Sequence, residues 1–96
     1  MAVLSERERD EALAGLAGWS FDHGRNGIAK GFAFADFGEA FAFMTRVALE
    51  AEKADHHPEW SNVWNKVEIL LSTHSAGGVT AKDVALAARI EAIAGG

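Results

Sequence analysis

Three helix-start signals divide this chain and constrain its fold more than any other feature of the sequence. Each signal is a Ser, Asp or Thr followed three positions later by Glu or Asp, the spacing at which two side chains satisfy free backbone N–H groups in a first helical turn. The three pairs are Ser5 with Glu8, Asp36 with Glu39, and Thr80 with Asp83. The first helix is expected to close at Gly15 and Gly18, the second to run to about Ala54, and the third to end at Gly95.

The segments between the expected helices alternate in the manner of β-strands and predict two hairpins. In the first hairpin, residues 19–21 and 28–35 flank a turn-rich stretch. In the second, residues 60–64 and 67–73 flank a turn at 65–66. The order helix, strand, strand, helix, strand, strand, helix is typical of the α+β class, with a four-stranded antiparallel sheet and three helices on one face.

The apolar residues of the second and third helices indicate how the layers pack. On the second helix one apolar stripe is formed by Phe37, Phe41, Met44, Ala48 and Ala51. On the third, one side carries Leu86, Ile90 and Ile93 and another carries Val84, Ala88 and Ala92. A helix that is apolar on several sides is usually covered on several sides, and a short chain gains burial by self-association. We therefore expect a homodimer or homotetramer in which the last helix contributes to a subunit contact.

Length, charge and composition exclude several classes of protein. A length of 96 residues accommodates a single domain, residues 1–96. The formal net charge of −5 is spread along the chain without a block of Lys or Arg, so no direct nucleic-acid partner is expected. The absence of cysteine excludes disulfides, thiolate metal sites and cysteine nucleophiles. The sequence has neither a signal-peptide pattern nor a membrane-spanning stretch, which predicts a soluble cytoplasmic protein without a membrane partner.

Three of the four histidines fall in two loops that the second hairpin brings together. His56 and His57 precede its first strand and His74 follows its second, and antiparallel pairing places those strand ends side by side. Imidazole changes charge near neutral pH, so converging histidines can accept a proton at one point of a substrate and donate one at another. Trp60 and Trp64 add flat aromatic surface suited to a planar heterocycle.

Each of these residues also has a purely structural explanation. Adjacent histidines are often solvated loop residues, tryptophans are more often core than ligand platforms, and Asp83 on its own is a helix cap. Three histidines could bind zinc. However, the chain has neither an HExxH motif nor a Cys/His ligand pattern, and neighbouring residues of an extended segment point to opposite faces. We therefore rank acid–base chemistry above a metal site.

Together these residues form a spaced set that resembles the signature of the pterin-4a-carbinolamine dehydratase family. The set is Glu52, three residues, His56-His57-Pro58, five residues, Trp64, nine residues, His74, eight residues and Asp83. The resemblance extends over residues 4–93, with further matching stretches at 62–67, 71–74 and 77–80. Two departures are mild: Trp64 stands where tyrosine is common in the family, and Val79 stands where leucine is usual.

The resemblance implies a lyase of this α+β fold that needs no cofactor and no metal. The implied substrate is 4a-hydroxytetrahydrobiopterin or a related pterin, and the products are quinonoid dihydropterin and water, in tetrahydrobiopterin recycling. It carries over His56, His57 and His74 as the catalytic histidines, of which we assign His56 and His74 to proton transfer and His57 mainly to pterin binding. The substrate-binding and supporting residues are Glu52, Pro58, Trp60, Trp64 and Asp83.

A protein-binding module of the same fold is the alternative to an enzyme. Some animal members of the family also act as dimerisation cofactors for a homeodomain transcription activator. The acidic charge of this chain suits a protein partner better than direct contact with DNA. An intact set of three histidines favours the enzyme, because an adaptor has no need of three titratable groups in one pocket.

Overall fold

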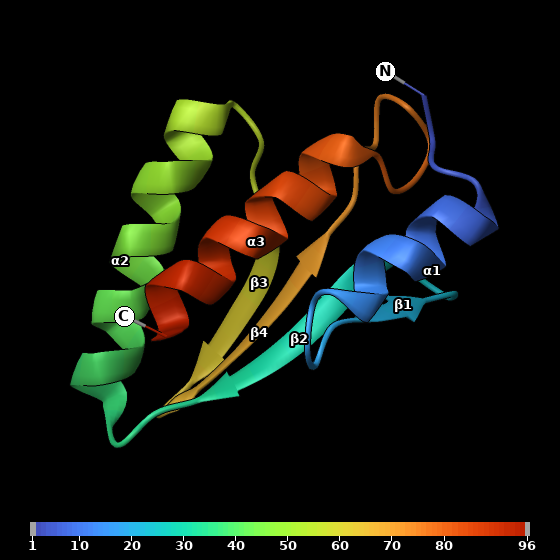
Figure 1. Cartoon of the computed structure of the whole chain (residues 1–96). Coiled ribbons are helices and arrows are strands. Elements are labelled where there is room, and N and C mark those ends of the chain that lie inside the picture. The colour runs from blue at the N-terminus through green and yellow to red at the C-terminus, as the bar shows by residue number, and fades with distance from the viewer. Residues whose placement is uncertain (1, 96) are drawn as a thin grey trace.

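The chain folds as three helices and four strands in the order expected from the sequence (Figure 1). The computed structural model describes residues 2–95. The elements are α1 (Glu6–Ala14), β1 (Ser20–Asp22), β2 (Gly27–Ala33), α2 (Phe37–Ala54), β3 (Glu59–Val63), β4 (Lys66–Leu71) and α3 (Ala81–Gly95). The predicted α+β class and element order are confirmed. Within residues 2–95, no helix is both long enough and apolar enough to cross a bilayer.

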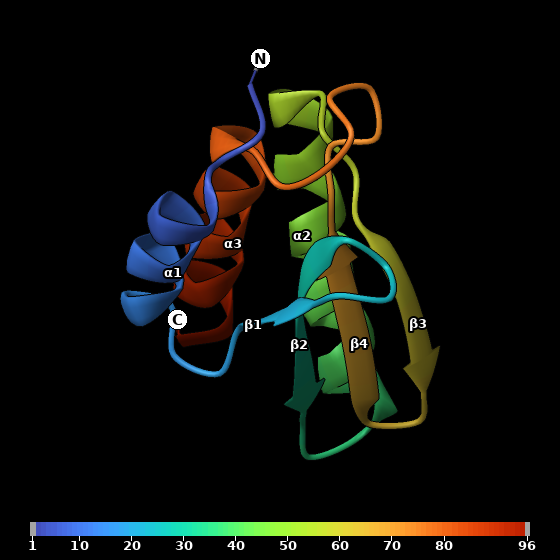
Figure 2. The ribbon, with the colours of Figure 1, turned by 90° about the vertical axis from the view of Figure 1, so that its right-hand side faces the viewer.

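All four strands join one antiparallel sheet in the order β1-β2-β4-β3, and the helices pack on one face of it (Figure 2). β2 and β4 are far apart in the sequence but are neighbours in the sheet, where Ile28 lies opposite Leu71. β3 pairs with β4 so that Glu59 lies opposite Leu70. The beginning of β3 and the end of β4 are therefore side by side, as the prediction for the two histidine loops requires.

The three helices begin where the capping pairs predicted. At α1 the Glu8 backbone N–H donates to Ser5 Oγ (3.1 Å), and the Ser5 N–H donates to Glu8 Oε1 (2.9 Å). The bond from the Ser5 N–H lowers the pKa of the Glu8 carboxyl below its ordinary value. At α2 the Asp36 carboxylate accepts from the Glu39 N–H (2.8 Å). The pair at α3, Thr80 with Asp83, lies in the candidate site.

The core lies between the sheet and helices α2 and α3. Alternation along β4 turns its apolar side chains toward the helices. The largest fully buried apolar residues are Ile28, Val67, Ile69 and Leu71 from the sheet, Val47 from α2, and Leu86 and Ile90 from α3. The alternation predicted for β4 is confirmed on this face.

Helix α2 is apolar on two adjacent sides, and only one of them faces the core. Its buried residues are Ala40, Phe43, Val47 and Ala51. The stripe expected from the sequence shares only Ala51 with this set, and Phe37 and Phe41 remain 50% and 56% exposed. Of the expected stripe, only Ala51 and the partly buried Met44 contact the core, so the stripe lies mostly outside the core-facing side. Both sets of residues recur at helical spacing, and periodicity alone does not choose between them.

Helix α3 is covered within the chain on more sides than the sequence predicts. Figure 2 shows α3 lying between α1 and α2. Its buried apolar residues are Leu86, Ala87 and Ile90, and those partly buried against the same core are Val84 and Ile93. Glu91 of α3 also accepts a hydrogen bond from Trp19 Nε1 (2.7 Å). One chain thus covers the large apolar side chains of α3, and this removes the reason for placing a subunit contact there.

The turn of the second hairpin lies one residue earlier than predicted. β3 ends at Val63 and β4 begins at Lys66, so the turn residues are Trp64 and Asn65. Trp64 has a left-handed backbone (φ 51°), and the Asn62 side chain donates to the carbonyls of Trp64 (3.0 Å) and Lys66 (2.9 Å). Trp64 consequently lies at the tip of the hairpin with 64% of its surface exposed.

Two valines of this hairpin test the assignment of the core. Val67 is fully buried on β4, whereas Val63 is 75% exposed on β3. Val67→Ala should lower the free energy of unfolding by roughly 1.5–3 kcal/mol, because it loses buried surface and leaves a cavity. Val63→Ala, the control, should change it by no more than about 0.5 kcal/mol. Urea unfolding followed by circular dichroism measures both, and equal losses would contradict this placement of Val67.

Candidate active site

One helix end and two loops meet where β3 begins and β4 ends. Helix α2 stops at Asp55, whose backbone is left-handed (φ 51°), and the His56 N–H donates to the Ala51 carbonyl (3.1 Å). The chain then enters β3. After β4, residues 72–80 lead into the first turn of α3. His56, His57 and His74 are thus all carried to this end of the sheet.

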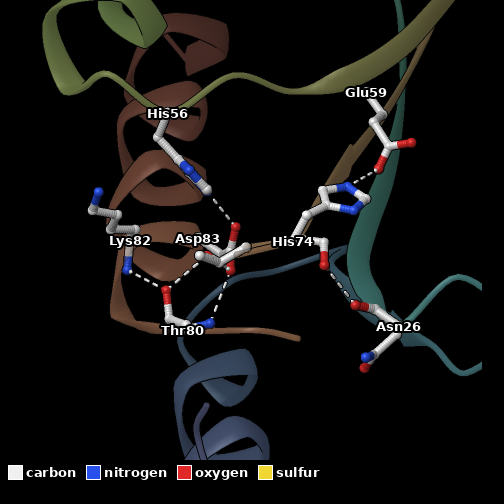
Figure 3. Close-up of polar contacts among 9 residues, drawn as sticks. Asn26, His56, Glu59, His74, Thr80, Lys82 and Asp83 are labelled. Atoms are coloured by element: carbon white, nitrogen blue, oxygen red, sulfur yellow. Dashed lines mark hydrogen bonds and ion pairs between the residues drawn. The ribbon is translucent and has the colours of Figure 1, made fainter. Parts of the chain in front are cut away.

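His56 is the most buried of these three histidines. Its side chain is 11% exposed, and its Nε2 lies 2.5 Å from Oδ1 of Asp83, which is fully buried (Figure 3). An ionised carboxylate accepts hydrogen bonds and cannot donate them. With Asp83 ionised, the proton of this bond therefore sits on Nε2, and Nδ1 is the ring nitrogen left for exchange with another molecule.

The second oxygen of Asp83, Oδ2, accepts hydrogen bonds from residues at and just before the start of α3 (Figure 3). It accepts from the Thr80 backbone N–H (2.8 Å) and from the Thr73 hydroxyl (2.8 Å). Thr80 Oγ1 accepts from the Lys82 N–H (3.2 Å) and lies 2.8 Å from Thr73 Oγ1. The predicted Thr80–Asp83 capping pair is confirmed, and the same carboxylate also holds His56.

His57 and His74 are paired with carboxylates at the surface. His57 Nε2 lies 2.7 Å from Glu52 Oε1, and His74 Nε2 lies 3.0 Å from Glu59 Oε2. All four side chains are more than half exposed. Exposed pairs of this kind are weak, so they orient the rings less firmly than buried Asp83 orients His56.

The structure brings the histidine loops together, as predicted, but turns the rings toward different partners. In Figure 3 the His56 ring points toward Asp83 and the His74 ring toward Glu59. His57, next to His56 in the sequence, faces Glu52 at the end of α2 instead. The loops adjoin, since His74 reaches the first residue of β3. That all three rings line one cavity stays a prediction.

The aromatic residues expected beside the histidines lie in different places. Trp60 is half-buried, packs against the core and borders a cavity of about 250 Å³ between β3 and α2. Pro58 is half-buried just before β3. Trp64 lies in the turn at the opposite end of the hairpin from His56 and His74. The prediction that Trp64 supplies aromatic surface beside the histidines is therefore wrong for a single chain.

Two residues that were not predicted from the sequence also contribute to this region. Glu59 holds His74, and Thr73 donates to Asp83. A signal for Thr73 was present in the sequence, because it continues the core-facing alternation of β4 with a polar side chain. A buried hydroxyl needs a hydrogen-bond partner. Glu59, an exposed residue at the start of a strand, gave no comparable signal.

The chemistry of this region is that of histidine–carboxylate pairs. Within residues 2–95, no three His, Asp or Glu side chains are grouped so that they could hold a metal ion. Each of the three histidines instead faces one carboxylate. A carboxylate fixes which ring nitrogen carries the proton, so such pairs are suited to proton transfer.

The sequence of this chain is similar to the sequences of one protein family. The sequence profile of pterin 4 alpha carbinolamine dehydratase matches residues 2–93. A relative from Rhizorhabdus wittichii, which carries the provisional name pterin-4-alpha-carbinolamine dehydratase, is 62% identical over 91 residues, covering 95% of this chain and 94% of the relative. One from Paraburkholderia xenovorans with the same provisional name is 57% identical over 90 residues, covering 94% of each.

Two solved structures share the fold. A transcriptional coactivator/pterin dehydratase from Brucella melitensis is 50% identical, with a TM-score of 0.93 over 96% of this chain and 98% of that one. A pterin dehydratase-like protein identified as a RuBisCO assembly factor in the alpha-carboxysome is 28% identical, with a TM-score of 0.70 over 81% of this chain and 90% of that one.

The double use of the Asp83 carboxylate predicts a large effect on stability. Asp83→Ala removes the carboxylate that accepts from His56, Thr73 and the Thr80 N–H, and it leaves these buried donors without a partner. The free energy of unfolding should therefore fall by about 3 kcal/mol or more. Asp10→Ala removes the same group from an exposed position of α1 and should change stability by no more than about 0.5 kcal/mol. Chemical unfolding of both variants checks this. A loss at Asp83 no larger than that at Asp10 would exclude the buried network.

Proposed function

The chain belongs to the pterin-4a-carbinolamine dehydratase family, and on this basis we propose that it removes water from a 4a-hydroxytetrahydropterin. The observation that carries the proposal is the buried His56–Asp83 pair, with His57 and His74 at the same end of the sheet. We place the reaction in the cytoplasm, in the recycling of tetrahydrobiopterin. No cofactor enters the proposed reaction.

The dehydration needs two proton transfers at different atoms of the substrate. The C4a–O bond breaks, the leaving hydroxyl takes up a proton to become water, and N5 loses its proton as its electron pair forms the N5=C4a bond. The reaction is thus an elimination that needs one base and one acid. In the proposal His56 and His74 fill these two roles. An imidazole on each of two loops can do this near neutral pH, because its two protonation states are close in energy there.

The surrounding residues fit the binding of a flat, nitrogen-rich ring. A cavity of about 190 Å³ beside the His74–Glu59 pair is lined by Arg25, Glu59, Trp60, Ser61, Glu68 and Ile69. Its glutamates can accept hydrogen bonds from the N–H groups of a pterin. In the proposal His57, held by Glu52, and Pro58 border the substrate on the α2 side.

Replacing the two proposed proton carriers tests the function. The double variant His56→Ala and His74→Ala should lose at least about 100-fold in catalysed rate, since one acid–base group alone contributes about 10²–10⁴-fold. His23→Ala, in the exposed turn after β1, is the matched control and should keep the parent rate. Stopped-flow absorbance with enzymatically generated 4a-hydroxytetrahydropterin measures all three proteins. Retention of most activity by a folded double variant would refute the proposal.

A protein-binding role is the second candidate, and the outer side of α2 favours it. The large apolar side chains left exposed on this helix are Phe37, Phe41 and Leu49. The alpha-carboxysome relative shows that a protein of this fold can act as an assembly factor. The two candidates are distinguishable, because a binding role through α2 does not require His56 or His74.

We propose that the expected homodimer or homotetramer forms through this side of α2 rather than through α3. Exposed phenylalanines on a helix of a short chain gain burial when a second copy covers them. Phe41→Glu should then reduce the mass in solution to that of the 10.2 kDa monomer. Val63→Glu places the same charge at an exposed apolar position of β3 and should leave the oligomer intact. Light scattering after size exclusion measures the mass of each protein. The proposed contact would be contradicted if the parent protein were a monomer, or if Phe41→Glu left the oligomer unchanged.

A further inference from the structure

We propose that Thr73 is a positioning residue of the active site. Its hydroxyl holds the Asp83 carboxylate in the orientation that keeps the His56 proton on Nε2, so that His56 exchanges protons with the substrate through Nδ1. The inference rests on the proposed dehydratase function, and it assigns a role to a residue outside the histidine signature.

The hydrogen bonds around Asp83 have only one consistent direction. With Asp83 ionised, Thr73 must donate its own proton to Asp83 Oδ2, because a carboxylate only accepts. The bond between the two threonine hydroxyls therefore takes its proton from Thr80, whose oxygen accepts from the Lys82 N–H. The remaining oxygen, Oδ1, accepts from His56 Nε2. Thr80 therefore donates to Thr73, and Thr73 donates to Asp83. The same carboxylate accepts from the imidazole of His56 on its other oxygen.

This direction fixes the tautomer of His56. Neutral imidazole carries one proton, and Asp83 places it on Nε2. Within residues 2–95, Nδ1 makes no hydrogen bond, and it is not among the buried nitrogen atoms without a partner. Nδ1 is thus the ring nitrogen available to accept or return a proton of the substrate.

The hydroxyl of Thr73 has no evident use in packing. Thr73 is 7% exposed and follows Val67, Ile69 and Leu71 on the core-facing side of β4. Valine would occupy the same volume there, and a hydroxyl buried without a partner is costly. Its backbone is held independently of its side chain: the N–H donates to Gly78 O (2.9 Å), and the carbonyl accepts from Ala76 and Gly77 (both 3.0 Å).

Thr73 also connects the two proposed proton carriers. It directly precedes His74, so the loop that presents one of these histidines also supplies the hydroxyl that positions the other. A change confined to this hydroxyl should disturb His56 through Asp83 and leave the His74–Glu59 pair in place.

Two threonine variants and one control separate positioning from packing. Thr73→Val keeps the shape and removes the hydroxyl, Thr73→Ser keeps the hydroxyl without the methyl group, and Ser20→Ala removes a hydroxyl from an exposed position of β1. Thr73→Val should lower kcat about tenfold, the effect of losing one bond to a charged group, with KM within about twofold. Thr73→Ser should keep most of kcat, and Ser20→Ala should match the parent.

The ¹⁵N NMR spectrum of the histidine rings gives a readout that does not depend on turnover. In the parent at a pH where His56 is neutral, its Nε2-protonated tautomer should predominate. Thr73→Val should shift its population toward Nδ1–H, and Thr73→Ser should restore the parent spectrum. An unchanged kcat together with an unchanged His56 spectrum in folded Thr73→Val would overturn the inference.

The two readouts distinguish the failure of this inference from the failure of the proposed function. A parent protein that does not dehydrate a 4a-hydroxytetrahydropterin refutes the function, and the NMR comparison then still decides whether Thr73 positions His56. An active parent with a Thr73→Val variant of equal rate and equal spectrum refutes the positioning role alone.

Discussion

The burial of the Asp83 carboxylate is the constraint on which the site depends. A fully buried carboxylate is tolerated only when donors surround it, and here the donors come from three parts of the chain. His56 arrives from the end of α2, Thr73 from the end of β4 and the Thr80 N–H from the start of α3. The segments that form the site are therefore held in place by the same bonds that satisfy one charge.

The same constraint divides the three histidines into two kinds. His56 is enclosed and has one defined orientation, whereas His57 and His74 are exposed and paired with exposed glutamates. A proton carrier gains from a fixed orientation, because transfer requires a defined donor–acceptor geometry. An exposed ring can adapt to a ligand as it binds. The geometry thus supports a rigid His56 and more adaptable partners around an incoming ring.

Local signals were enough to predict where the helices start. The errors concern one turn with an unusual backbone conformation and two side chains whose partners lie far along the chain. Capping pairs act within four residues, so the starts of all three helices followed from the sequence. The hairpin turn was misplaced because Trp64 takes a left-handed backbone that sequence rules assign to Asn or Gly. Trp64 lies far from the histidine loops with either turn, because those loops lie at the other end of the hairpin. Glu59 and Thr73 were missed because their partners lie 15 and 10 residues away.

The proposed catalysis and the proposed protein contact need not compete, because they would use different parts of α2. Phe37 and Phe41 lie near its beginning, while Glu52, the partner of His57, lies in its last turn. From Phe41 to Glu52 is 11 positions, which at 1.5 Å per residue is about 16 Å along the helix. A protein contact made by the two phenylalanines can therefore leave the histidine end open. A protein contact that extends to Leu49 comes close to the last turn of α2. The length of the contact along α2 therefore decides whether the two proposed roles are independent.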